Sequence, residues 1–100
     1  MIRMLSKGHK MNLAGDVVSS ELGDGVALLD LRGGVYYGLN PVGARVWRLL
    51  EEKPRNFFEI REVLLDEYDV SPDVCERELE LLLWDLLERR LIYVEDESRV

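Results

Sequence analysis

The first third of the chain alternates apolar and polar residues in a way that predicts three short strands. They cover residues 17–22, 26–31 and 35–39, and the turns between them, Gly23-Asp24-Gly25 and Arg32-Gly33-Gly34, contain glycine. Glycine turns of this length join consecutive strands into hairpins. The pattern therefore predicts an antiparallel three-stranded meander with the third strand at an edge.

The same alternation predicts which strand residues face the core. In the second strand, Ala27, Leu29 and Leu31 share one face, and we assign this face to the core. In the third strand, Tyr37 shares a face with its apolar neighbours and is also assigned to the core. Tyr36 is expected to face away from it.

Three helices are predicted after the strands, and each has a start signal. Asn40 and Ser71 are good N-caps, since their side-chain oxygens can accept a hydrogen bond from a free N–H of the first turn. Each is followed by a proline, which is favourable at the first helical position. Asn56 and Glu59 have the spacing of a capping box. A short terminal strand is predicted at 92–94.

The third predicted helix carries apolar residues on two sides. With a turn of 100° per residue, one side forms a core stripe of Cys75, Leu79, Leu82, Leu83 and Leu86. The far side carries apolar residues bordered by charge, namely Val74, Arg77, Glu78, Leu81, Trp84 and Asp85. Two explanations are open: the helix is sandwiched between other elements, or its far side is the wall of a binding groove with a charged rim.

Length and composition favour one soluble globular domain. The chain has 100 residues, of which 47% are hydrophobic and 33% charged. No apolar run approaches the roughly 20 residues that a membrane helix needs, and no secretory signal is recognisable. We expect a flexible arm over 1–15, a folded domain over 16–95, an acidic tail over 96–100, and a cytoplasmic location.

The charge distribution argues against nucleic acid as a partner. Residues 1–50 contain six Lys or Arg and four Asp or Glu, whereas residues 51–100 contain seven and sixteen, and the whole chain has a net charge of −7. Affinity for a phosphate backbone requires a basic face. The second half of the chain offers the opposite.

No catalytic or metal-binding constellation is recognisable. Cys75 and His9 are the only residues of their types, so neither a disulfide nor a zinc site nor a Cys/His nucleophile pair is expected. There is no glycine-rich phosphate loop and no Ser/His/Asp set. We therefore predict a protein without catalytic residues, metal or cofactor.

Two stretches resemble the PqqD-like family, the leader-recognition domains of ribosomally made peptide natural products. They are VALLDLRGGVYYGLNPVGARVWRLL and FEIREVLLDEYDVSPDVCERELELLLWDLLERRLI. The resemblance covers roughly residues 17–95, and its most specific element is the block YYGLNPVGARVW followed by EYDVS. It implies an α+β, winged-helix-like fold with a three-stranded antiparallel sheet followed by three helices. The run LLDLRGGVYYGLN is most similar to the free-standing recognition protein of lasso-peptide clusters.

The resemblance also implies a binding mode and partners. The leader of a precursor peptide would lie along the third strand as an extra antiparallel strand, in the cleft beside the third helix. Carried to this chain, the strand residues are Val35, Tyr36, Tyr37 and Gly38, and the helix face is Val74, Arg77, Glu78, Leu81, Trp84 and Asp85. The chain would be a non-catalytic adaptor for a separate cysteine leader peptidase and an asparagine-synthetase-like cyclase, with no membrane or nucleic-acid partner.

Three alternatives remain open at this stage. The chain could be a leader-binding accessory of another peptide-modifying enzyme, such as a radical SAM enzyme in quinone-cofactor synthesis. A winged-helix DNA-binding regulator has the right number of elements, but its third helix would turn acidic residues towards DNA. The family fold could also persist with a lost or altered ligand.

Overall fold

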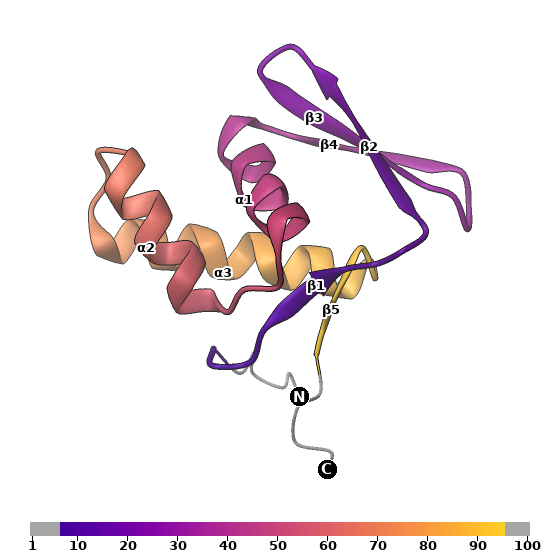
Figure 1. Cartoon of the computed structure of the whole chain (residues 1–100). Helices are drawn as coiled ribbons and strands as arrows, with labels where there is room; N and C mark the ends of the chain where they lie inside the picture. Colours follow the sequence, from indigo (N-terminus) through magenta and orange to yellow (C-terminus); the bar gives the residue numbers. More distant parts are fainter. Residues whose placement is uncertain (1–6, 96–100) are drawn as a thin grey trace.

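The computed structural model describes residues 7–95, which form two antiparallel sheets and three helices (Figure 1). The strands are β1 (Met11–Leu13), β2 (Val17–Leu22), β3 (Gly25–Asp30), β4 (Val35–Leu39) and β5 (Ile92–Val94). The helices are α1 (Pro41–Glu52), α2 (Phe57–Glu67) and α3 (Pro72–Glu88). The prediction of an α+β, winged-helix-like fold with a three-stranded sheet followed by three helices is confirmed.

The three-stranded sheet has the order β2-β3-β4, so β4 is an edge strand as predicted. Its central row aligns Val18 with Leu29 and Leu29 with Tyr36. Gly23 and Gly34, one in each hairpin turn, have φ values of 64° and 71°. These positive values explain why glycine is needed there, since other residues rarely adopt them.

The core-facing side of β3 is the opposite of the predicted one. Val26 and Leu28 are fully buried, whereas Ala27 and Leu29 are half-buried and Leu31 is 56% exposed. The assignment of Ala27, Leu29 and Leu31 to the core was therefore wrong. Both faces of this strand are apolar, and alternation alone does not show which face α1 will cover.

The expectation of a flexible arm over residues 1–15 is wrong for residues 11–13. These form β1, which pairs with β5 so that Met11 lies opposite Val94 and Leu13 opposite Ile92. Met11 is only 1% exposed and belongs to the core. The terminal strand predicted at 92–94 is confirmed as β5, while residues 1–6 and the tail at 96–100 lie outside the described residues.

The three predicted helix starts are confirmed. Asn40 caps α1 by accepting a hydrogen bond from the backbone N–H of Gly43 at 2.8 Å. Asn56 and Glu59 form a complete capping box at the start of α2, and the N–H of Asn56 lowers the pKa of Glu59 by stabilising its carboxylate. The side chain of Ser71 caps α3.

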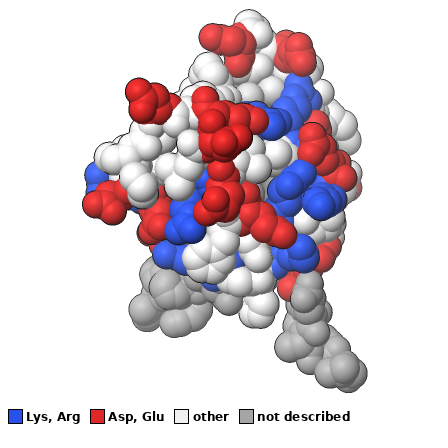
Figure 2. Space-filling model, turned by 60° about the vertical axis from the view of Figure 1, so that its left-hand side comes forward, with Lys and Arg blue, Asp and Glu red and all other residues white. Residues whose placement is uncertain are grey.

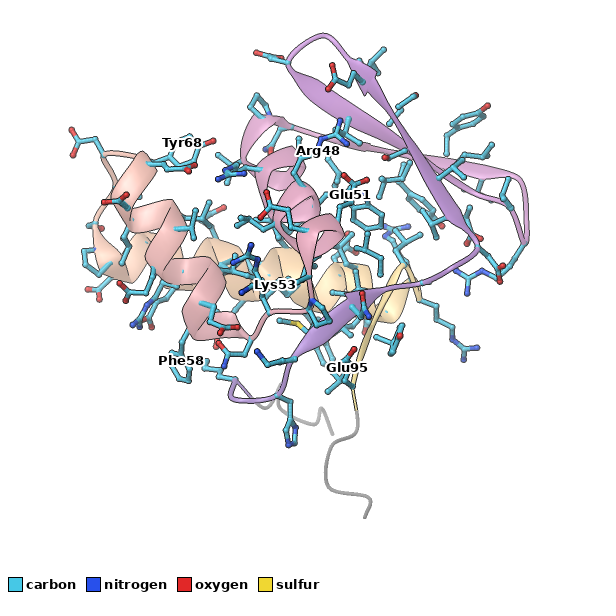
Figure 3. All side chains as sticks on the ribbon, viewed as in Figure 1. Arg48, Glu51, Lys53, Phe58, Tyr68 and Glu95 are labelled. Atoms are coloured by element: carbon cyan, nitrogen blue, oxygen red, sulfur yellow. The ribbon has the colours of Figure 1, made fainter. Side chains whose placement is uncertain are left out.

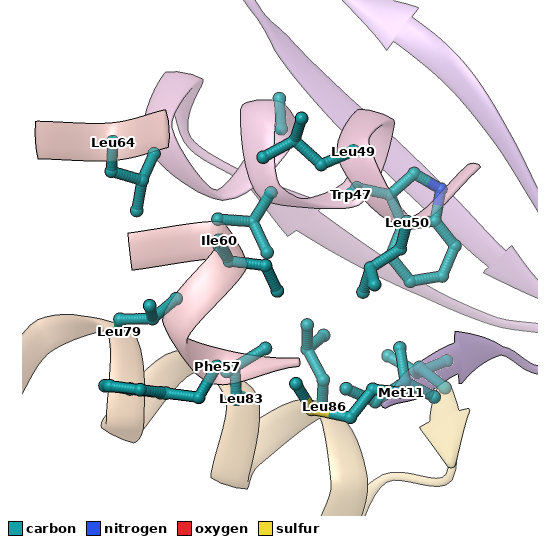
Figure 4. Close-up of a cluster of buried hydrophobic side chains, with 14 of the residues drawn as sticks. Met11, Trp47, Leu49, Leu50, Phe57, Ile60, Leu64, Leu79, Leu83 and Leu86 are labelled. Carbon is teal, nitrogen blue, oxygen red and sulfur yellow. The ribbon is translucent and has the colours of Figure 1, made fainter. Parts of the chain in front are cut away.

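The core lies where α1 passes between the three-stranded sheet and the other two helices (Figure 4). Its largest fully buried side chains include Trp47, Phe57, Ile60 and Leu83. On its sheet-facing side, α1 also makes polar links. Arg48 and Glu51 project from α1 (Figure 3), and Glu51 accepts a hydrogen bond from the Ser19 hydroxyl at 3.0 Å. The sheet is thus held to α1 by both apolar and polar contacts.

We expect Met11→Ala to lower the free energy of unfolding by about 2–5 kcal/mol, because it leaves a cavity where β1 meets the core. Urea denaturation followed by circular dichroism would measure this change. His9→Ala, at an exposed position two residues earlier, is the control and should have little effect. Equal stability of the two variants would show that β1 is not part of the folded core.

Candidate functional site

The hydrogen-bond pattern of β3 decides which backbone groups of β4 face outwards. The N–H of Leu31 donates to the carbonyl of Asp16 at 2.8 Å, which makes these residues a hydrogen-bonded pair between β3 and β2. Such pairs alternate along an antiparallel ladder. Leu29 and Ala27 therefore also bond to β2, and the intervening residues of β3 bond to β4.

Because the hydrogen bonds of β3 alternate between β2 and β4, two residues of β4 are left with unpaired backbone groups. Val35, Tyr37 and Leu39 lie opposite the β3 residues that bond towards β4, so their N–H and C=O groups are used. The N–H and C=O groups of Tyr36 and Gly38 point away from the sheet. Within residues 7–95, no strand pairs with this side of β4.

The free edge also lacks the usual protection against strand pairing. Edge strands are commonly blocked by charged side chains, proline or a bulge, but β4 has the sequence VYYGL and pairs regularly with β3. Tyr36 is 70% exposed, and a Cβ atom added to Gly38 would meet no atom within 4 Å. Gly38 therefore places no side chain in the way of a guest strand at this edge.

Helix α3 accompanies β4 in the opposite chain direction. Near the start of β4, the Arg89 guanidinium lies 4.8 Å from the centre of the Tyr37 ring, and Arg32 donates a 2.7 Å hydrogen bond to the Arg90 carbonyl. At the other end of β4, Asn40 lines the same pocket as Val74 near the start of α3. We use the name β4–α3 groove for the strip of surface that runs along β4 and α3 between these two ends, of which the pocket described next is the hollow part.

A pocket of about 410 Å³ forms the end of this groove where β4 runs into α1. Most of its lining is apolar, and it comes from the start of α1, the end of α2 and the first half of α3. Tyr68 projects from the end of α2 towards α1 (Figure 3). The lining residues are Asn40, Val42, Gly43, Val46, Leu64, Tyr68, Asp69, Val70, Val74, Cys75, Glu78, Leu79 and Leu82.

The four predicted strand residues lie together along β4. Val35, Tyr36 and Gly38 are exposed, whereas Tyr37 is half-buried and packs against the core. The prediction that Tyr37 faces inwards and Tyr36 outwards is confirmed. β4 thus presents one aromatic ring to the groove and another to the outer face of the sheet.

The six predicted residues of α3 do not all lie together. Val74 and Glu78 line the pocket, and Asp85 accepts a 3.0 Å hydrogen bond from Arg89 near Tyr37. Leu81 is 62% exposed. The other two, the exposed Arg77 and the half-buried Trp84, are outside the pocket lining.

Sequence reasoning missed the pocket itself. Cys75, Leu79 and Leu82 were assigned to the core, and each is buried or half-buried as expected, yet all three also line the pocket. Val42, at the start of α1, also lines the pocket and is 40% exposed. A helical wheel describes one helix, whereas this pocket is formed where three helices converge.

The charged groups at the other end of the groove form local pairs. Asp30 accepts hydrogen bonds from Arg32, which lower the pKa of the Asp30 carboxyl. Bonds to Asp85 and to Tyr37 raise the pKa of Arg89, which is the C-cap of α3. Arg90 follows Arg89 with a φ of 62°, so the α-helix does not continue beyond its C-cap.

These features define a winged-helix-like domain with an open sheet edge beside an apolar pocket. The family model described as coenzyme PQQ synthesis protein D (PqqD) matches residues 25–92. The chain therefore belongs to the PqqD family, as the sequence resemblance predicted.

Solved structures agree with this assignment. One is described as TbiB1 in complex with the TbiA(beta) leader peptide; it is 36% identical, with a TM-score of 0.74 over 89% of this chain and 98% of that one. Another is described as lasso peptide synthetase B1 complexed with the leader peptide; it is 28% identical, with a TM-score of 0.69 over 82% and 95% of the two chains. No curated protein matches the sequence.

Two further observations concern what residues 7–95 contain. None of their helices has the length and apolar character required to cross a bilayer. In the same part of the chain, no three His, Cys, Asp or Glu side chains are grouped so that they could hold a metal ion.

We expect Cys75 to react slowly with iodoacetamide in the folded protein. Burial raises the pKa of its thiol, so less of the reactive thiolate is present at any given pH, and the side chain is also poorly accessible. Mass spectrometry should show alkylation at least about tenfold slower than in urea, where the thiol has its ordinary pKa. Equal alkylation rates in the folded protein and in urea would mean that Cys75 is accessible to the reagent in the fold.

Proposed function

We propose that this chain is a non-catalytic adaptor that binds the leader segment of a ribosomally made precursor peptide. The single observation that carries the proposal is the free, unblocked edge of β4 beside the pocket at the end of the β4–α3 groove. Support comes from the two similar structures, which are described as complexes with leader peptides.

The binding mode we propose is addition of one antiparallel strand to β4. The leader would exchange hydrogen bonds with the N–H and C=O groups of Tyr36 and Gly38, which have no partner within the described residues. Its side chains would alternate between the two faces of the enlarged sheet. Those on the Tyr37 face would lie over the groove, and those on the Tyr36 face would point to the outer side.

Backbone hydrogen bonds between strands depend little on the sequence of the guest, so specificity must come from sites that bind its side chains. An antiparallel leader would have its N-terminal part near the pocket, because β4 runs towards the pocket. Burying one apolar side chain there would contribute about 1.5–3 kcal/mol. A leader that is disordered when free loses conformational entropy on binding, so we expect modest affinity.

The proposed site keeps the residues predicted from the sequence and adds the pocket lining. On the strand these are Val35, Tyr36, Tyr37 and Gly38. On α3 they are Val74, Arg77, Glu78, Leu81, Trp84 and Asp85. Val74 and Glu78 have the most direct support, because they line the pocket next to the end of β4.

The downstream partners we propose are those of lasso-peptide maturation: a separate cysteine leader peptidase and an asparagine-synthetase-like cyclase. The support is the similarity to a lasso peptide synthetase B1. The alternative is a leader-binding role for a radical SAM enzyme, since the matching family model is described as coenzyme PQQ synthesis protein D. The genes next to the coding sequence would separate the two, because they would encode either a transglutaminase-like peptidase and a cyclase or a radical enzyme.

The direct test is fluorescence titration of the labelled precursor leader encoded in the same gene cluster. We expect saturable binding by the wild-type chain, and Gly38→Pro should weaken it about tenfold by removing an N–H that bonds to the guest strand. Proline is tolerated at an edge position whose N–H faces outwards, so the fold should persist. Gly38→Ala is the matched control, because it keeps the N–H and its Cβ meets open space.

Two outcomes would contradict strand addition to β4. Unchanged affinity of Gly38→Pro would show that the outward N–H of Gly38 is not used. Equal weakening by Gly38→Pro and Gly38→Ala would point to a side-chain clash in place of a lost hydrogen bond. Thermal melts of both variants would show whether the fold is intact.

Substitutions on α3 should also weaken leader binding. We expect Val74→Asp and Leu81→Asp to weaken leader binding about tenfold with little change in the melting temperature, since both side chains are exposed in the free protein. Trp84→Ala, also in the predicted face, should weaken binding more than folding. The same titration with parallel melts would decide, and equal losses of stability and binding would mean that these residues serve only the core.

A further inference from the structure

We infer that the β4–α3 groove recognises the order of charges along its peptide: a basic residue on the N-terminal flank and an acidic residue on the C-terminal flank. This inference rests on the proposed function and deepens it by naming the class of peptide that fits. It is carried by two unpaired carboxylates at one end of the groove and an unpaired arginine at the other, with the apolar pocket at the first end to anchor the peptide.

The pocket end of the groove is acidic. Asp69 and Glu78 are the charged residues of the pocket lining, and both are exposed. Among residues 7–95, no Lys or Arg lies within ion-pair distance of either carboxylate. A cation entering the pocket mouth would therefore meet two uncompensated carboxylates.

The helix dipole does not account for Glu78. Asp73 lies in the first turn of α3, where a carboxylate stabilises the helix by interacting with its positive N-terminal end. This effect falls off within one turn, and Glu78 lies beyond it, at the seventh position of the helix. Its carboxylate therefore has no evident role in stabilising α3.

Three arginines lie at the opposite end of the groove. Arg32, Arg89 and Arg90 meet where the β3–β4 turn contacts the end of α3. Asp30 pairs with Arg32 and Asp85 pairs with Arg89. Arg90 is exposed and has no carboxylate within ion-pair distance among the described residues, so its charge is available to an acidic residue of the peptide.

The distance between the two ends predicts the spacing of charges in the peptide. Arg89, the C-cap of α3, lies eleven positions after Glu78, which corresponds to about 16 Å at a rise of about 1.5 Å per residue. An extended strand covers that length with about five residues, at about 3.3 Å each. The basic and acidic residues should therefore be about five positions apart, which matches the length of β4.

Charge order would also set the direction of the peptide. In the antiparallel orientation, the basic N-terminal flank lies near Glu78 and the acidic C-terminal flank near Arg90. A parallel guest of the same sequence would place like charges together at both ends, which disfavours binding. The groove thus distinguishes two orientations that strand pairing alone would allow.

The test compares two synthetic peptides of identical composition. Both contain the same uncharged Leu- and Thr-rich strand segment; one has Lys on the N-terminal and Glu on the C-terminal side, and the other has these charges exchanged. We follow binding by chemical-shift changes at the amides of Tyr36 and Gly38. The first peptide should bind at least about fivefold more tightly at low salt, and high salt should reduce the difference.

Charge-reversal variants make the test specific. Glu78→Lys should remove or invert the preference, whereas Asp66→Lys makes a charge change of the same size at an exposed position of α2 outside the pocket lining and should preserve it. A nitroxide at the N-terminus of the preferred peptide should broaden the amide signals of Val42 and Gly43. Broadening at Gly33 and Gly34 instead would show the opposite orientation.

The outcomes separate this inference from the proposed function. Equal affinity of the two peptides, or no binding by either, overturns the role of charge order. Binding of the natural leader at Tyr36 and Gly38 would leave the adaptor function standing in both cases. Failure of the natural leader itself to perturb the β4 edge would instead refute the proposed function.

Discussion

Hydrogen-bond parity in β3 is the constraint on which the site depends. Because Leu31 bonds to Asp16 on the β2 side, every second residue of β3 is committed to β2 and the others to β4. Tyr36 and Gly38 are consequently left with outward-facing backbone groups, while Tyr37 is turned towards the groove. A shift of one residue in this register would exchange the two tyrosines between the faces of the sheet.

Helix α1 converts this strand edge into a site by holding the other parts in place. It is buried between the sheet and the remaining helices, and its first turn, capped by Asn40, forms one wall of the pocket. The face shown in Figure 2 has acidic side chains through its middle with basic ones interspersed. This face therefore lacks the continuous basic surface that nucleic-acid binding requires.

The sequence predicted features that are encoded locally and missed those that depend on distant contacts. Glycine turns and cap residues such as Asn56 act within a few positions, so the meander and the helix starts were predictable. β1 is only three residues long and its partner lies some eighty residues later, so no local pattern indicated it. Both faces of β3 are apolar in the sequence, so the pattern did not show which of them is buried. The pocket exists only because α1, α2 and α3 converge.

The pairing of β1 with β5 has a consequence for how such a domain is used in larger proteins. Met11 and Val94 lie opposite each other, so the chain enters and leaves the fold at neighbouring points, away from the three-stranded sheet (Figure 1). Domains with adjacent entry and exit points tolerate insertion into another polypeptide. This architecture is therefore suited to insertion into another polypeptide with the β4 edge still accessible.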